Sequence, residues 1–101
     1  MAYRLTELAR SQIIDSYEYG YFEFGEAQAE KYFHELHHCF ELLSDNPRLA
    51  RLHENFDPPV RIHFHGSHYI VYRIADRSND IEIFAVIRKG VALGNYLAKI
   101  L

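Results

Sequence analysis

The chain has 101 residues, of which 49% are hydrophobic and 15% aromatic, and its formal net charge at pH 7 is −3. This composition is too apolar for a disordered chain, and the length allows one domain, residues 1–101, with one modest core. The negative charge gives no reason to expect direct sequence-specific DNA binding, which would need a local basic patch. The single cysteine excludes an internal disulfide and a cysteine-rich zinc site.

No run of residues approaches the roughly 20 apolar residues that a membrane span needs. Charged residues also interrupt the segment after Met1, so it does not resemble a signal peptide. We therefore expect a cytoplasmic protein without a membrane partner.

The first half of the chain predicts a short strand followed by two helices. Residues 3–6 alternate as in a strand, and Thr6 is a suitable N-cap for a helix that starts at Glu7. Apolar residues then recur at helical spacing until Gly25, which ends this helix because glycine enters the left-handed conformation without strain. A second helical pattern follows at once and ends at Asn46-Pro47. Two helices joined by so tight a turn form an antiparallel hairpin.

The second half predicts a meander of three strands after an irregular segment. Residues 60–65 and 68–75 alternate apolar and polar side chains, and Gly66-Ser67 between them is a hairpin turn. A third strand, residues 81–88, follows a polar turn. The fold class is therefore α+β, with the helical hairpin on one face of an antiparallel sheet.

The last eleven residues, 91–101, predict a short amphipathic C-terminal helix. This helix has two expected positions. It either folds over part of the sheet face opposite the hairpin, or it stays free for a partner.

Alternation divides the strand residues into two rows, one for each face of the sheet. The row predicted to pack beneath the hairpin contains Ile62, Phe64, Ile70, Tyr72, Ile74, Ile81, Ile83, Ala85 and Ile87. The opposite row, predicted to be open, contains Arg61, His63, His65, Tyr69, Val71, Arg73, Phe84, Val86 and Arg88. An apolar centre rimmed by cations is typical of a binding surface.

Seven histidines raise the question of a metal site. His63 and His65 share one strand face, but no carboxylate or cysteine lies near them in sequence to complete the ligand set. Cys39 lies in the middle of a helix, where nothing lowers the pKa of a thiol. We therefore expect no metal and no organic cofactor, and we assign no catalytic residue.

The remaining candidates for chemistry are cations with two aromatic neighbours. They are Arg61, Arg73, Arg88 and Lys89, with Tyr69 and Tyr96 as stacking groups. Arginines with aromatic rings on an open sheet suit RNA binding and stabilisation of phosphate charge, or a protein interface. The interface is favoured because RNA cleavage needs a positioned acid and base, although the histidines on the open face leave cleavage as an alternative.

Three segments stand out beside the order of the elements, namely Gly25–Tyr32, Asn46–Leu49 and His65–Arg73. Together with that order, they closely resemble the ParE toxins of the RelE/ParE superfamily. The segments 3–6 and 81–86 also look like the edge strand and the last strand of that family. The resemblance extends from Tyr3 to Arg88.

This resemblance implies the toxin of a bacterial type II toxin–antitoxin system, of the kind that stabilises plasmids, with a single RelE/ParE-like domain. ParE toxins arrest growth by poisoning DNA gyrase without acting as ribonucleases, and a ParD-like antitoxin neutralises them in a hetero-oligomer. We expect the antitoxin to bind Arg61, Tyr69, Val71, Arg73, Phe84 and Val86. We expect the target to contact Arg88, Lys89 and Tyr96.

Two alternatives stay open. RelE-type relatives are endoribonucleases that cut messenger RNA on the ribosome with a basic cluster and a C-terminal tyrosine or histidine. In this chain Arg73, Arg88 and Lys89 would match the basic cluster, and Tyr96 would match the tyrosine. The chain is not enriched in Lys and Arg as such enzymes are, because its net charge is −3. The third possibility is an inactive homologue that retains only antitoxin binding.

Overall fold

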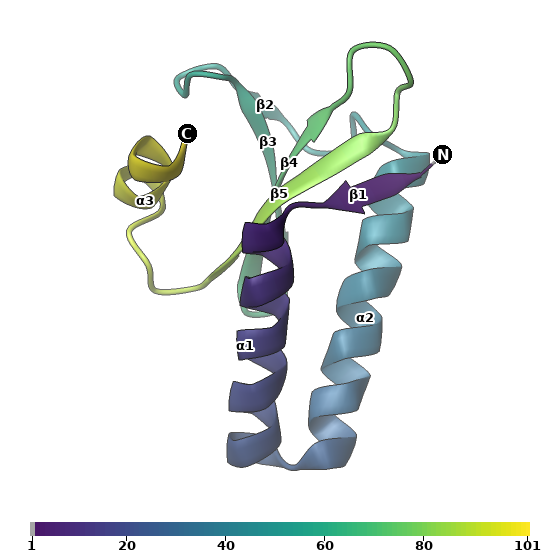
Figure 1. Cartoon of the computed structure of the whole chain (residues 1–101), viewed down its shortest axis with the longest axis vertical. Coiled ribbons are helices and arrows are strands. Elements are labelled where there is room, and N and C mark those ends of the chain that lie inside the picture. The colour runs from purple at the N-terminus through teal and green to yellow at the C-terminus, as the bar shows by residue number, and fades with distance from the viewer. Residues whose placement is uncertain (1) are drawn as a thin grey trace.

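The computed structural model of the chain describes residues 2–101, and it confirms the predicted α+β class (Figure 1). Along the chain its elements are β1 (Tyr3–Leu5), α1 (Glu7–Phe24), α2 (Glu26–Asp45), β2 (Leu52–His53), β3 (Val60–His65), β4 (His68–Ile74), β5 (Ile81–Arg88) and α3 (Leu93–Ile100). The predicted antiparallel hairpin, three-strand meander and C-terminal helix are all present.

The sheet has the strand order β1-β5-β4-β3-β2. The meander β3–β4–β5 is antiparallel as predicted, but β1 pairs with β5 in parallel, so the sheet is mixed. Parallel neighbours require a long crossover, and here the helical hairpin and most of the meander separate the two strands. The short β2 lies in the segment predicted to be irregular and pairs with the edge of β3.

Local signals set the ends of both long helices. The Thr6 hydroxyl oxygen accepts a hydrogen bond from the backbone N–H of Ala9 at 3.1 Å, which caps the start of α1. Gly25, with φ of 90°, separates the two helices. Asn46 ends α2 and donates its backbone N–H to the Leu42 carbonyl. Figure 1 shows that the closed end of the hairpin projects well beyond the sheet.

A β-bulge in β5 changes which residues face the hairpin. Val71 lies opposite Ala85 while Tyr72 lies opposite Ile83, so Phe84 is an extra residue in β5. Beyond this point the alternation reverses. The predictions for Ala85 and Ile87, expected beneath the helices, and for Val86, expected on the open face, are therefore wrong.

The face prediction was also wrong for β3. Ile62 lies opposite Val71 and Phe64 opposite Tyr69, which places both apolar residues on the side away from the hairpin. The physical reason is that α1 and α2 pack mainly on β1 and β5. The apolar side chains of β3 are therefore buried on the face away from the hairpin. Arg61 consequently points to the hairpin side, where its Nη1 donates to the Ala50 carbonyl at 2.6 Å.

The C-terminal helix α3 folds over the face of the sheet opposite the hairpin. This confirms the first of the two positions expected for it. Leu97 of α3 is fully buried against that face and forms a second core with Val60, Val71, Ala85 and Ile87. The expectation that this face is open is therefore wrong. The first core lies between the hairpin and the sheet, around Phe40 and Tyr72.

The turn between β3 and β4 generates a stability prediction. Gly66 has a φ of 56°, and a Cβ atom there would lie 2.8 Å from a ring carbon of Tyr32. We expect Gly66→Ala to lower the free energy of unfolding by about 1–3 kcal/mol, because it combines backbone strain with a steric clash. Denaturant unfolding followed by circular dichroism measures this loss.

The matched control is Gly94→Ala. Gly94 lies in α3 with open space around its Cα, so alanine should leave stability unchanged or raise it by up to about 1 kcal/mol. Equal stability of the two variants would contradict the proposed role of Gly66.

Candidate functional site

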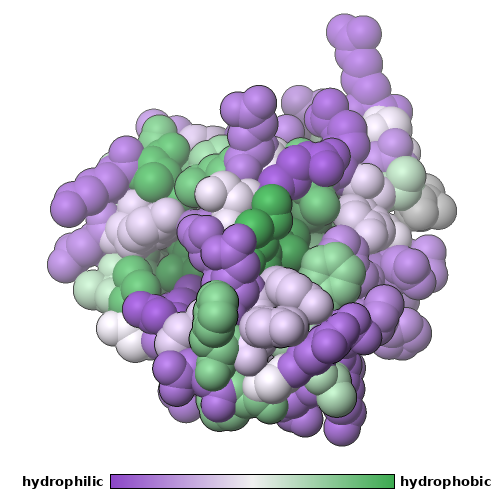
Figure 2. All heavy atoms as spheres, turned by 60° about the horizontal axis from the view of Figure 1, so that its bottom comes forward, coloured by the Kyte–Doolittle hydropathy of each residue, from purple (hydrophilic) through white to green (hydrophobic). Residues whose placement is uncertain are grey.

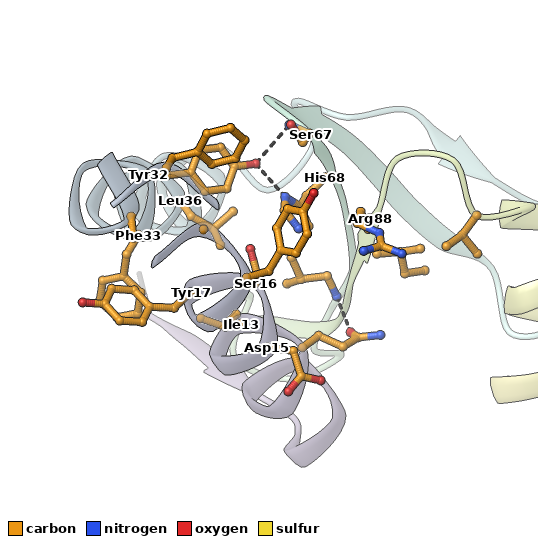
Figure 3. A pocket seen from close by; sticks show the side chains of 18 of the residues that line it. Ile13, Asp15, Ser16, Tyr17, Tyr32, Phe33, Leu36, Ser67, His68 and Arg88 are labelled. Atoms are coloured by element: carbon orange, nitrogen blue, oxygen red, sulfur yellow. Dashed lines mark hydrogen bonds between the residues drawn. The ribbon is translucent and has the colours of Figure 1, made fainter. Parts of the chain in front are cut away.

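A groove of about 770 Å³ lies between the hairpin and the end of the sheet where β4 begins and β5 ends (Figure 3). Ser16 and Tyr17 of α1 and Tyr32 of α2 line its hairpin side, while His68 and Arg88 line its sheet side. The lining is mainly apolar. A cleft of this size with a few polar groups is a typical binding site.

The polar centre of the groove is a contact between Tyr32 and His68. The Tyr32 hydroxyl lies 2.6 Å from His68 Nδ1 and accepts the backbone N–H of Ser67 at 3.0 Å, as the dashed lines in Figure 3 indicate. Burial lowers the pKa of His68, with smaller contributions from the nearby Arg88 and His65, and burial raises the pKa of Tyr32. Both side chains are therefore neutral at pH 7.

Arg88 brings positive charge to this centre. Its side chain is exposed, and its guanidinium carbon lies 5.9 Å from the ring centroid of Tyr19 on α1. Arg88 was expected on the open face of the sheet but lies on the hairpin side, because the bulge reverses the alternation of β5. Its contact with the target stays a prediction. Asp15 also lines the groove, so both signs of charge are present.

Gln12 connects α1, β5 and α3 at the edge of the groove. Its Nε2 donates to the Tyr96 hydroxyl at 2.8 Å, and its Oε1 accepts the backbone N–H of Val86 at 2.7 Å. Tyr96, predicted to contact the target, is thus half-buried and held by Gln12. The sequence analysis missed Gln12, because a single glutamine on a helix carries no periodic signal, and it assigned no functional role to Tyr32.

The six residues expected to bind the antitoxin do not form one surface. Tyr69, Val71, Arg73 and Phe84 share the face that α3 covers, whereas Arg61 and Val86 lie on the hairpin side. Val71 is fully buried, so it is closed to a partner while α3 is in place. A role for the partly exposed Tyr69, Arg73 and Phe84 stays a prediction.

The basic residues that would match a RelE-type site are also separated. Arg73 Nη2 binds Glu82 at 2.9 Å near the start of β5, whereas Arg88 ends that strand. The two positions on β5 are about 20 Å apart at the usual rise per residue. Lys89 extends toward Phe64 of β3, with its Nζ 5.9 Å from the ring centroid. The structure therefore gathers no basic cluster from these residues.

Within residues 2–101, no group of three or more His, Cys, Asp or Glu side chains is placed to hold a metal ion. No helix in the same range has the length and apolar character needed to cross a membrane.

Comparison with known proteins places these features in a family. Residues 3–91 match the family model for the ParE toxin of the type II toxin–antitoxin system parDE. Toxin ParE1 of Mycobacterium tuberculosis is 32% identical over 72 residues, covering 71% of this chain and 74% of the relative. Toxin ParE1 of Caulobacter vibrioides is 29% identical over 89 residues, covering 88% and 90% of the two chains.

A solved structure has the same fold. A chain of the chromosomal ParDE toxin–antitoxin system from P. aeruginosa superimposes with a TM-score of 0.72 at 19% identity, over 88% of this chain and 96% of that one. The family match extends over both helices of the hairpin and the whole sheet. The chain therefore belongs to the ParE toxin family of type II toxin–antitoxin systems.

Proposed function

We propose that this ParE-family toxin inhibits DNA gyrase in the cytoplasm and that a ParD-like antitoxin neutralises it by occupying the groove. Family membership supports the toxin role, and the structural similarity to a chain of a ParDE system supports a ParD-like partner. Inhibition by binding also suits a chain to which we assign no catalytic residue.

The groove supports the antitoxin part of this proposal. It is mainly apolar, and its volume of about 770 Å³ suits a peptide segment that lays an apolar face between Tyr17 and Phe33 of the hairpin and the end of the sheet. Arg88 at its sheet side would bind a carboxylate of such a segment. Apolar recognition with one charged contact fixes both affinity and orientation.

We favour gyrase over messenger RNA as the target because Arg73 lies far from Arg88. Ribonucleolytic cleavage needs cations gathered around one phosphate together with an acid and a base. The net charge of −3 likewise provides no long-range attraction to RNA. One observation favours the ribonuclease alternative, namely the contact of Tyr32 and His68 beside Arg88.

The antitoxin prediction concerns Ser16, which lines the groove from α1. We expect Ser16→Trp to weaken binding of the cognate antitoxin by about tenfold or more, because the indole fills space that the antitoxin segment needs. Isothermal titration calorimetry with the purified antitoxin measures this affinity.

The matched control is Ser11→Trp, an exposed position on the same helix outside the groove. It should leave the affinity unchanged. Equal affinity for both variants would place the antitoxin elsewhere, with the partly exposed Tyr69 and Phe84 as the next candidates.

The target prediction concerns the two cations at the end of β5. We expect the purified toxin to inhibit gyrase supercoiling in vitro, and the double variant Arg88→Ala/Lys89→Ala to lose about tenfold or more of this potency. Both side chains are exposed, so the free energy of unfolding should fall by no more than about 1 kcal/mol.

The exposed pair Arg48→Ala/Arg51→Ala removes the same charge elsewhere and should inhibit like the wild type. Normal supercoiling at excess wild-type toxin, together with cleavage of ribosome-bound messenger RNA, would favour the RelE-like alternative. Growth arrest without either effect would exclude both targets, and a loss of toxicity with retained antitoxin binding would identify an inactive homologue.

A further inference from the structure

The end of the sheet that borders the groove carries a row of basic side chains on one face. His65 of β3 lies directly opposite His68 of β4, and His68 lies directly opposite Arg88 of β5. Residues that pair in this way point to the same side of the sheet. His68 and Arg88 line the groove, where Tyr32 of α2 contacts His68 (Figure 3). We call His68 and Arg88, together with Tyr32, the His–Arg site.

The hydrogen bonds of Tyr32 determine which nitrogen of His68 carries the hydrogen. The Tyr32 hydroxyl donates to the His65 carbonyl at 3.3 Å and accepts the backbone N–H of Ser67 at 3.0 Å. A hydroxyl has one hydrogen to donate and two lone pairs to accept with. In the assignment that satisfies all its contacts, the 2.6 Å contact is therefore a hydrogen bond from His68 Nδ1–H to the Tyr32 oxygen. His68 Nε2 is then left with a free lone pair.

His68 Nε2 is open to the groove. Within residues 2–101, the one enclosed side-chain nitrogen or oxygen without a hydrogen-bond partner is His65 Nε2. His68 Nε2 has no partner in the fold either, so it is not enclosed. A proton added there leaves the Nδ1–H bond to Tyr32 in place, because an imidazolium donates from both nitrogens. His68 can therefore become charged without any rearrangement of its contacts.

The charged groups around His68 include no paired anion. Arg88 lies beside it, and no carboxylate in the described part of the chain forms an ion pair with the Arg88 guanidinium. Asp15 of α1 points away from the site in Figure 3, and Glu35 of α2 is exposed. Burial, Arg88 and His65 together lower the pKa of His68, so it is neutral in the free toxin.

Apolar side chains surround the His–Arg site. Tyr17, Phe33 and Leu36 line the groove on the hairpin side, and Val86 lines it on the sheet side. Figure 2, which turns the closed end of the hairpin toward the viewer, shows apolar and near-neutral side chains interrupted by hydrophilic ones on this side of the molecule. A segment seated on such a lining excludes water, and opposite charges attract more strongly where water is excluded.

We propose that His68 and Arg88 hold one carboxylate of the antitoxin segment between them, and that His68 takes up a proton from solvent at Nε2 when this carboxylate binds. The inference rests on the proposed antitoxin site in the groove. A carboxylate has two oxygens, so it accepts one hydrogen bond from Nε2–H and one from the Arg88 guanidinium. The antitoxin segment therefore presents one acidic group among apolar side chains.

Proton uptake makes antitoxin binding depend on pH in one direction. In the free toxin the pKa of His68 lies below its usual value, mainly because of burial, and a carboxylate beside Nε2 raises it. Between these two pKa values the complex holds more protons than the free proteins do, so the affinity increases as the pH falls. The gain is at most about tenfold per pH unit, the limit for one proton, and it ends below the pKa of the free toxin.

The test compares the wild type with His68→Asn, whose side-chain amide can still contact the Tyr32 hydroxyl but does not titrate. Isothermal titration calorimetry with the purified antitoxin, run at one pH in phosphate and in Tris, measures the protons taken up on binding. We expect more uptake by the wild type than by the variant. From pH 8 to pH 6, the wild-type Kd should fall by about threefold or more beyond the fall in the variant.

The matched control is His38→Asn, the same change at an exposed position of α2 outside the groove, which should take up protons like the wild type. Equal uptake by the wild type and His68→Asn would overturn the proposal. NMR gives a check that needs no variant, because the pKa of His68 in the wild type should be higher in the complex than in the free toxin. An unchanged or lower pKa in the complex would overturn the proposal too.

Changes in the antitoxin identify the carboxylate. Each Asp or Glu is replaced in turn by Asn or Gln, and a synthetic antitoxin segment is compared with and without an amidated C-terminus. The group whose loss reduces both affinity and proton uptake is the one that His68 and Arg88 hold. If no side chain and no C-terminus has this effect, the proposal is refuted.

The Ser16→Trp variant separates this proposal from the antitoxin site on which it rests. Weakened binding by Ser16→Trp, without proton uptake by the wild type at His68, would refute the carboxylate site and leave the groove as the antitoxin site. Undiminished binding by Ser16→Trp would refute the groove itself, and the carboxylate site with it.

Discussion

The extra residue Phe84 in β5 is the constraint on which the rest of this structure depends. β5 pairs with β1 on one side and β4 on the other, so it is the strand that the hairpin must cover. A regular strand would direct Ala85 and Ile87 toward the hairpin together with Ile83. The bulge instead turns them to the opposite face, where they form a second core with Leu97. One inserted residue therefore creates the seat for α3, and it also turns the Val86 N–H toward Gln12.

The length of the hairpin lets different parts of it take different roles. At about 1.5 Å per residue, the 20 residues of α2 extend for about 30 Å, which is longer than the sheet that they cover. The inner part of the hairpin packs on β1 and β5, and the middle forms one side of the groove. In the outer part every residue from Tyr21 to Gln28 is exposed, including Phe22 and Phe24. The same two helices thus serve the core and the groove in succession.

The sequence predicted those features that local chemistry determines. Thr6 as an N-cap, Gly25 between the helices and Asn46 after the second helix each act within one or two turns of chain, and all three were predicted correctly. The faces of the strands were harder. Ile62 was misplaced because its alternation does not reveal which face the helices cover, and Val86 because nothing in the sequence marks the bulge. The groove brings together Tyr32 and His68, 36 residues apart, which no local pattern predicts.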